Sequence, residues 1–270
     1  MASRHHSDSL RHFLATVMLP LAAIGACATA HAEDKAPEPD YTLSFNVGVT
    51  SDYRVRGIAQ TSGKPAIQGG IDLGFKNGFY LGTAASNVRW VKEFNGASKG
   101  SYEVDLYGGL KGPIAETGVS YDVGIITYRY PGNDSGAASS NLPGAYSKAD
   151  TTEIYGALTY NIVTFKYSRS LGDFLGNLNS SGSQYFDLSA AVDLTNGFTL
   201  TPHIGRQLIP NQTGRASYSD ASLTLAKDFG NGISATASLI GSDADRVFYT
   251  DTRGRFLGDN TIVVGAKYTF

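Results

Sequence analysis

The chain has 270 residues, of which 41% are hydrophobic and 17% are charged, and its formal net charge is −2. This aromatic-rich composition excludes a disordered chain, and beyond the N-terminal leader no stretch of about 18 apolar residues exists from which a membrane helix can be built. The nearly neutral, slightly acidic charge argues against a nucleic acid as partner. The high Gly and Tyr content, with many Ser and Thr, is typical of an all-β chain, either one barrel or two small sandwiches.

Residues 1–32 have the pattern of a secretory signal peptide. A basic leader precedes an apolar run over residues 13–25, and Ala30-His31-Ala32 fits the small-residue site at which such leaders are cleaved. A second processing route stays open, because Ile24-Gly25-Ala26-Cys27 is similar to the sequence that precedes a lipid-modified cysteine. Either route predicts an exported protein.

Residues 33–40 form an acidic, proline-containing linker that we expect to be extended and periplasmic. From residue 41 to residue 270 the chain repeats one unit: an alternating strand, a tight turn, a second alternating strand and a longer polar loop. This repeat predicts a closed antiparallel transmembrane β-barrel of about twelve strands. The expected strands are 41–51, 66–75, 79–90, 101–111, 119–130, 151–160, 162–171, 184–194, 198–208, 218–229, 233–241 and 260–270.

Short and long connections alternate along the chain. Three short ones contain Asn-Gly pairs, Asn77-Gly78, Asn196-Gly197 and Asn231-Gly232, which supply the positive φ values of a type I′ hairpin. The longer connections are 52–65, 92–100, 131–150, 172–183, 207–217 and 242–259. A barrel with both termini in the periplasm has this order, with short inner turns and long outer loops.

Aromatic residues gather beside the short turns and share the parity of the apolar face. They predict an interfacial girdle made of Tyr41, Phe75, Phe79, Phe198, Phe229, Tyr268 and Phe270. Tyr53 has the outward parity at the other rim, where it would mark a second girdle. Pro202 lies within a strand on the outward parity, and because it removes a ladder hydrogen bond we expect a bulge there.

The last strand has an alternation of period two that runs to the C-terminus. Its apolar or aromatic positions are Ile262, Val264, Ala266, Tyr268 and Phe270. The terminal Phe270 resembles the C-terminal signature of bacterial outer-membrane barrels. This resemblance implies the barrel assembly machinery as a partner, and membrane lipid as the neighbour of the apolar face.

A longer motif gives a second resemblance. Ser51-Asp52-Tyr53-Arg54-Val55-Arg56-Gly57-Ile58-Ala59-Gln60 resembles the S-D-Y-x-x-R-G-x-x-Q signature of the TorF-type porin family of proteobacteria. Tyr128-Arg129-Tyr130-Pro131-Gly132 and Glu153-Ile154-Tyr155 are similar to two further segments of that family. The resemblance implies a barrel in the outer membrane of a Gram-negative bacterium that forms a channel, and it implies no defined substrate.

Strand parity places a set of charged residues on the lumen side. The candidates for the lumen or its constriction are Asp52, Arg54, Arg56, Asp72, Glu103, Asp105, Asp122, Glu153, Lys166, Asp187 and Lys267, and Asp193 has the same parity. Such groups either tune ion selectivity or pair with one another to plug the interior. Acids outnumber bases among them, which predicts a preference for cations.

Two interpretations remain for the arginines of the first loop. Arg54 and Arg56 either line a constriction opposite a carboxylate, or form a salt-bridged corner that fixes the loop, with Gly57 permitting the bend.

Catalytic and cofactor motifs are missing from the sequence after residue 32. His203 is the one histidine in this part of the sequence, and no G-x-S-x-G motif supplies a nucleophile for it. The same part of the sequence contains no His/Cys cluster suited to zinc and no phosphate-binding loop. We therefore expect no enzyme and no cofactor. The leading hypothesis is an outer-membrane porin for passive diffusion of small hydrophilic solutes or ions, and the alternative is a non-conducting barrel that acts as an adhesin, receptor or structural protein. The oligomeric state stays open.

Overall fold

The computed structural model describes residues 39–135, 146–212 and 214–270. The signal peptide predicted over residues 1–32, the alternative lipidation at Cys27 and most of the predicted linker lie outside the described residues. None of the helices in the described part of the chain has the length and hydrophobicity that a transmembrane helix requires.

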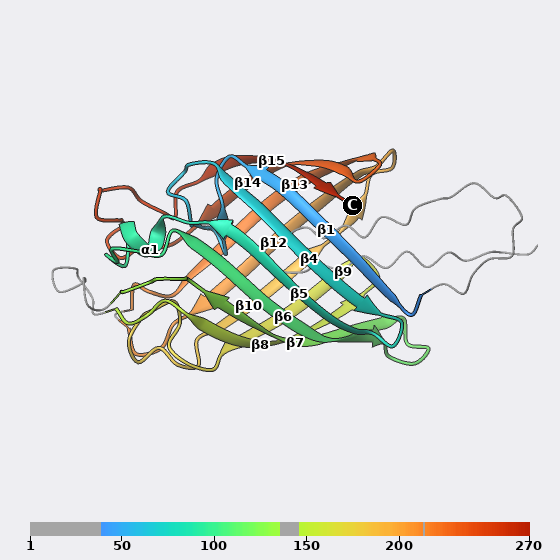
Figure 1. The fold of residues 1–270 in the computed structure, drawn as a ribbon, viewed down its shortest axis with the longest axis horizontal. Coiled ribbons are helices and arrows are strands. Elements are labelled where there is room, and N and C mark those ends of the chain that lie inside the picture. Colours follow the sequence, from blue (N-terminus) through green and yellow to red (C-terminus); the bar gives the residue numbers. More distant parts are fainter. Residues whose placement is uncertain (1–38, 136–145, 213) are drawn as a thin grey trace, which may run out of the picture. The chain divides into compact units, whose positions relative to one another are not determined.

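The described chain forms a closed, antiparallel β-barrel, which confirms the predicted fold (Figure 1). The sheet closes because the first strand, β1, pairs with β4 on one side and with the last strand, β15, on the other. Counting β10 and β11 as one interrupted strand gives the twelve strands of the barrel wall. They are β1 (Tyr41–Thr50), β4 (Ala66–Phe75), β5 (Phe79–Asn87), β6 (Tyr102–Pro113), β7 (Val119–Arg129), β8 (Thr151–Tyr160), β9 (Val163–Ser170), β10 (Gln184–Ala190) with β11 (Val192–Asp193), β12 (Phe198–Leu208), β13 (Tyr218–Gly230), β14 (Ile233–Ser242) and β15 (Thr261–Thr269).

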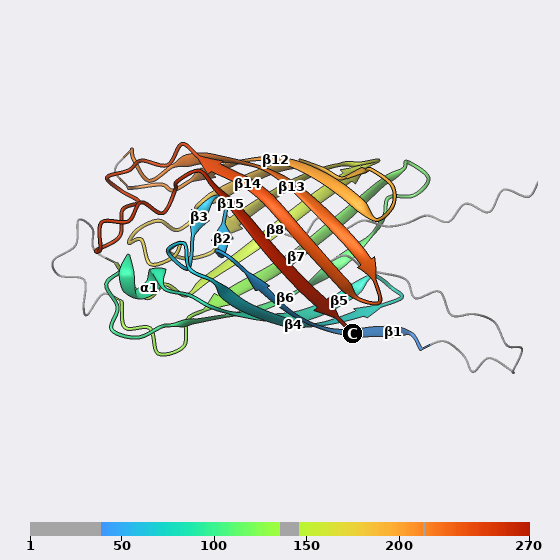
Figure 2. The same ribbon diagram turned by 90° about the horizontal axis from the view of Figure 1, so that it is seen from above.

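The two ends of the barrel differ. The long connections gather at one end, which we call the loop end, together with the short helix α1 (Trp90–Glu93) (Figure 1). The short turns and Phe270 lie at the opposite end, which we call the turn end. Two short strands, β2 (Arg54–Val55) and β3 (Ile58–Ala59), form a separate hairpin in the first long connection (Figure 2).

The outward face of the wall is apolar. Val49, Ile67 and Val264 are 55%, 67% and 52% exposed, and they alternate with inward polar residues. At the turn end the predicted aromatic residues lie exposed on the same face, where the ring centroids of Phe75 and Phe79 are 5.8 Å apart and those of Tyr268 and Phe270 are 5.4 Å apart. An apolar belt with aromatic residues at its rim is the surface that a barrel presents to lipid.

Several strand ends differ from the prediction by one or two residues, and two local predictions are wrong. The third strand was expected to extend to residue 90 but ends at Asn87, and Trp90 begins α1 instead. The turn at Asn77 is not type I′, because Gly78 has a positive φ of 88° and Asn77 does not. The side chain of Asn77 instead accepts a hydrogen bond from the backbone N–H of Phe79 at 3.0 Å.

The prediction of a bulge at Pro202 is also wrong. Pro202 pairs with Leu223 in an uninterrupted β12–β13 register. On its other side, pairing stops after Ser189 and resumes at Val192 in the same register, which leaves the gap between β10 and β11. The missing N–H of proline is thus accommodated by a break in the neighbouring strand rather than by an extra residue.

Candidate functional site

The first long connection folds into the barrel. In the β2–β3 hairpin Arg54 pairs with Ala59 and Val55 with Ile58, and the two turn residues, Arg56 and Gly57, have φ values of 49° and 80°. Two positive φ values are what a two-residue hairpin turn requires. We call residues 52–62 the plug. Ten of these eleven residues are buried, and the side chain of the other, Arg54, is only 2% exposed.

Arg54 fixes the base of the plug. Its Nε donates to Asp52 at 2.7 Å, and one terminal nitrogen donates to Asp259 at 2.6 Å. The other terminal nitrogen donates to the carbonyl of Gly57 at 3.0 Å. Because Asp259 lies just before β15, this salt-bridged corner joins the first loop to the last one.

Arg56 extends from the tip of the plug to the opposite wall. Its guanidinium donates to Glu153 on β8 and to Gln207 on β12, in both cases at 2.7 Å, and it lies 4.3 Å from the ring centroid of Tyr185 on β10. The Arg56 and Glu153 side chains are 4% and 1% exposed. Burial alone would lower the pKa of the Arg56 guanidinium, but the adjacent Glu153 carboxylate raises that pKa above its ordinary value, so the guanidinium stays charged.

Gly57 permits the tip to approach the wall closely. A Cβ atom at this position would lie 2.8 Å from the Cβ of Asp220 on β13 and 3.3 Å from that of Ser242 on β14. Both the positive φ and the lack of space require glycine here. The tip therefore contacts β8, β10, β12, β13 and β14 together.

Tyr53 holds the other side of the plug. The prediction that Tyr53 belongs to an outer aromatic girdle is therefore wrong. It is 5% exposed, and its hydroxyl donates to Glu103 on β6 at 2.5 Å. Tyr130, which directly follows β7, donates to the second oxygen of Glu103 at 2.6 Å. Burial, with the charges of Glu103 and Asp105, raises the pKa of Tyr53, so this hydroxyl remains a donor.

Nearer the turn end, tyrosines and charged residues cover one side of the lumen. Tyr107 donates to Asp72 at 2.5 Å, and Tyr80 donates to Asp122 at 2.6 Å. The ammonium group of Lys166 lies 3.9 Å from the ring centroid of Tyr155. These contacts are polar and lie on the inward face, so the interior below the plug is hydrophilic.

Inward glycines let these tyrosines lie along the wall. Gly82 pairs with Tyr107 across β5 and β6, and a Cβ at Gly82 would overlap the Tyr107 ring. Gly124 has the same relation to Tyr155 on β8. The tyrosine rings lie over the glycines and do not extend toward the barrel axis. The lumen is therefore wider than its number of tyrosines suggests.

His203 belongs to a polar cluster near the plug. Its Nε2 lies 3.0 Å from Asp187 and its Nδ1 lies 3.6 Å from Asp220, while Tyr185 donates to Asp220 at 3.0 Å. Ser189 and Ser222 pair with His203 on the adjoining strands, but the hydrogen bonds of the His203 side chain among the described residues go to Asp187 and Tyr185. No group of three or more His, Cys, Asp or Glu residues suited to a metal ion occurs in the described part of the chain.

Most of the predicted lumen residues lie on the inward face or in the plug. Asp52, Arg54 and Arg56 belong to the plug, and Asp72, Glu103, Asp105, Asp122, Glu153, Lys166, Asp187 and Lys267 belong to the wall strands. Asp193 is exposed at the turn end instead, where it accepts a hydrogen bond from the backbone N–H of Thr195 at 2.8 Å. Four further residues on the inward face were not predicted, although strand parity was available as a signal: Lys111, Tyr185, Gln207 and Asp220.

An aromatic cap lies over the plug at the loop end. Ile58 and Ala59 of the plug pack in one cluster with Tyr218, Ala244, Tyr249 and Leu257, against which Phe94, Phe248 and Phe256 also pack. The ring centroids of Phe94 and Tyr249 are 6.1 Å apart, which joins the connection that contains α1 to the last long loop. The loops thus hold the plug from above.

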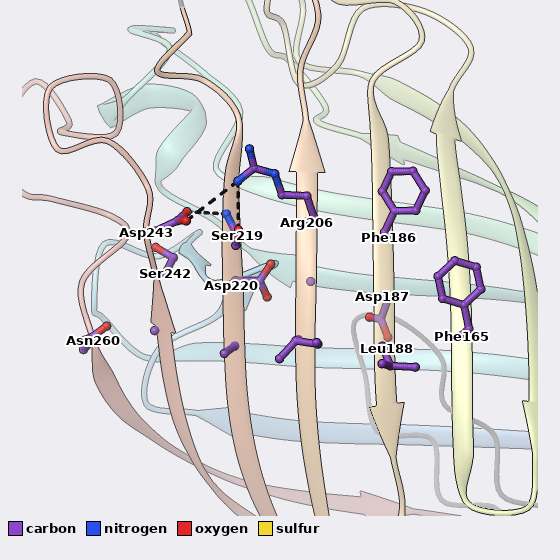
Figure 3. Close-up of a pocket in the computed structure, with 14 residues that line it drawn as sticks. Phe165, Phe186, Asp187, Leu188, Arg206, Ser219, Asp220, Ser242, Asp243 and Asn260 are labelled. Atoms are coloured by element: carbon purple, nitrogen blue, oxygen red, sulfur yellow. Dashed lines mark hydrogen bonds and ion pairs between the residues drawn. The ribbon is translucent and has the colours of Figure 1, made fainter.

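A hollow in the wall is lined by outward residues and also by Asp187 and Asp220 of the polar cluster around His203 (Figure 3). Its apolar part is lined by Phe165, Leu188 and Ile204, all of which are exposed. Arg206 lies at its upper edge and donates to Ser219 at 3.0 Å. The part lined by Phe165, Leu188 and Ile204 therefore belongs to the apolar outer surface.

Comparisons with known proteins agree with this architecture. A family model described as "Bacterial protein of unknown function (Gcw_chp)" matches residues 33–270. The chain is similar to a KdgM porin in complex with disordered oligogalacturonate, with a TM-score of 0.50 and 8% identity over 84% of this chain and 98% of that one. It is also similar to a NanC porin, with a TM-score of 0.51 and 11% identity over 84% of this chain and 99% of that one. No curated protein matches. At these identities the likeness concerns the fold alone.

Proposed function

Because this chain belongs to the Gcw_chp family of bacterial proteins of unknown function, we propose its activity from the barrel itself: an outer-membrane channel for small hydrophilic solutes or ions that the plug narrows or closes. The observation that carries this proposal is the charged, tyrosine-lined interior that continues below the plug. The polar interior of a membrane barrel is either filled with water, as in porins, or plugged, and here the wall below the plug keeps a polar surface that suits water and solutes.

The location follows from the same features. The apolar outward face and its aromatic rim suit a lipid bilayer, and the structural likeness to porins supports the outer membrane. We extend the proposal to export through the signal peptide over residues 1–32, to insertion by the barrel assembly machinery through Phe270, and to the TorF-type relationship suggested by the first-loop motif.

The plug sets the mechanism. Twelve strands spaced about 4.8 Å apart and tilted by about 40° give a backbone radius of roughly 12 Å, which inward side chains reduce to a passage several Å wide. The plug spans this passage at the loop end, from Arg54 beside β15 to Arg56 beside β8. Diffusion then requires that the Arg56 contacts release, or that solutes pass beside the tip.

A second candidate function is a non-conducting barrel that presents its loops as an adhesin, receptor or structural contact. The aromatic cap favours it, because the cap packs directly on Ile58 and Ala59 and so stabilises the closed arrangement. The two candidates differ in whether the plug ever leaves the lumen.

Planar-bilayer recordings test the proposal. We expect discrete current steps and, under a KCl gradient, a reversal potential that indicates cation preference, since inward acids outnumber inward bases. Clear anion selectivity would contradict the charge argument. Complete silence of the purified protein, in the wild type and after disruption of the plug, would favour the non-conducting barrel.

A further inference from the structure

Two carboxylates under the plug lack a cationic partner. Glu103 and Asp105 lie two residues apart on the inward face of β6 and are 1% and 6% exposed. Neither takes part in an ion pair with the described residues, whereas the comparably buried Glu153 is paired with Arg56. Burying ionised carboxylates is unfavourable unless their charge is compensated.

Asp105 is the more unusual of the two. Its Oδ1 is buried and has no hydrogen-bond partner among the described residues. Its neighbours on the adjoining strands are Ala84 and Tyr128, and the Tyr128 hydroxyl donates to Glu153 at 3.3 Å instead. The other inward carboxylates of this region have donors: Tyr107 for Asp72, Tyr80 for Asp122, Arg56 for Glu153, His203 for Asp187 and Tyr185 for Asp220.

The polar groups that contact Glu103 are hydroxyl oxygens. Tyr53 and Tyr130 donate to the two oxygens of Glu103, which leaves lone pairs on both hydroxyls and on Glu103 itself. Residues i and i+2 of a strand lie on one face about 7 Å apart, so both carboxylates can approach one ion between them. A donor set made only of oxygens suits hard cations and not zinc or copper.

We propose that Glu103 and Asp105 bind one hard metal cation, of the Na⁺, K⁺ or Ca²⁺ class, beneath the plug. The cation neutralises the pair and fastens the Tyr53 side of the plug to β6, as Arg56 fastens the tip to β8. The cation content of the medium thereby sets how firmly the plug is held. This binding does not depend on whether the barrel conducts.

Trp90 supplies a direct readout. It is the one tryptophan of the chain, is 5% exposed and has its ring centroid 5.2 Å from that of Tyr130, which donates to Glu103. The refolded full-length barrel is titrated with NaCl, KCl or CaCl₂ at constant ionic strength, with choline chloride as the counterpart that is too large to enter. We expect a saturable change in Trp90 emission and a rise in the unfolding midpoint of about 2–4 °C with at least one metal cation.

Matched variants decide the outcome. Asp105→Asn keeps the shape and removes the charge, so it is expected to abolish both responses, and Glu103→Gln serves the same purpose if the first variant does not fold. Glu116→Gln, in an exposed turn at the other end, should respond as the wild type does. A wild type that does not respond, or an Asp105→Asn barrel that responds equally, overturns the proposal. A response to pH alone also overturns it, because the two carboxylates would then share a proton.

Discussion

Replacing Arg56 by methionine is expected to destabilise the folded barrel by about 3–5 kcal/mol, because the change leaves Glu153 charged, buried and without its cation. Methionine keeps much of the aliphatic length, so the loss reports mainly the missing charge. Denaturant unfolding followed by Trp90 emission measures it. The same variant should also loosen the plug and raise the open probability in bilayers.

Two controls separate the ion pair from general damage. Arg129→Met removes an exposed partner of Asp150, 3.3 Å away, and should change stability by less than about 1 kcal/mol. Arg56→Met combined with Glu153→Leu removes both charges and should recover part of the lost stability. Equal effects of Arg56→Met and Arg129→Met would show that the buried pair does not hold the plug.

An arginine on the outward face is expected to have the next largest effect. Val264 lies near the middle of β15 and is 52% exposed, so Val264→Arg places a charge at the depth of the bilayer core and should cost about 2–4 kcal/mol. Thr236 lies on the adjacent strand, β14, where it pairs with Gly265. Because Gly265 follows the outward residue Val264, both Gly265 and Thr236 face inward. Thr236→Arg should therefore leave insertion nearly unchanged and alter ion selectivity.

Folding into lipid vesicles distinguishes the two arginine variants. The expected order is wild type and Thr236→Arg close together, with Val264→Arg clearly less stable. The reverse order would mean that the apolar side chains face the interior of the protein and that the barrel does not contact lipid through them.

The barrel was predictable because its signal is local. Alternation with a period of two assigns each strand residue to a face, and the alternation of short and long connections assigns each turn to an end. Glu153 and Lys166 were placed on the inward face in this way. The same alternation accounts for His203, which faces the lumen because its neighbours Pro202 and Ile204 face outward.

The plug was not predictable because its contacts are distant in sequence. Strand alternation no longer assigns residues to a face after the chain leaves β1. Tyr53 was therefore predicted on the outward face, although it is buried beside Glu103. The Arg56–Glu153 pair joins residues 97 positions apart, and Gln207 lies 151 positions from Arg56. The motif around Arg54 and Arg56 marked the segment as unusual, but only the closed barrel brings its partners together.

Pro202 illustrates a third kind of difference. Its chemistry correctly predicts an irregular ladder, since proline has no N–H to donate. Which strand absorbs the irregularity depends on the neighbour, and here β10 ends at Ala190 while β12 continues straight. A single sequence does not encode that choice in any local pattern.

The plug is expected to block a lumen that would otherwise conduct. Single-channel recording of the wild type beside a variant in which residues 53–62 are replaced by a short Gly-Ser connection tests this most directly. We expect small or infrequent currents for the wild type and large, steady currents for the variant, with both proteins folded to the same extent in vesicles. Two folded proteins with the same conductance, or with none, would contradict it.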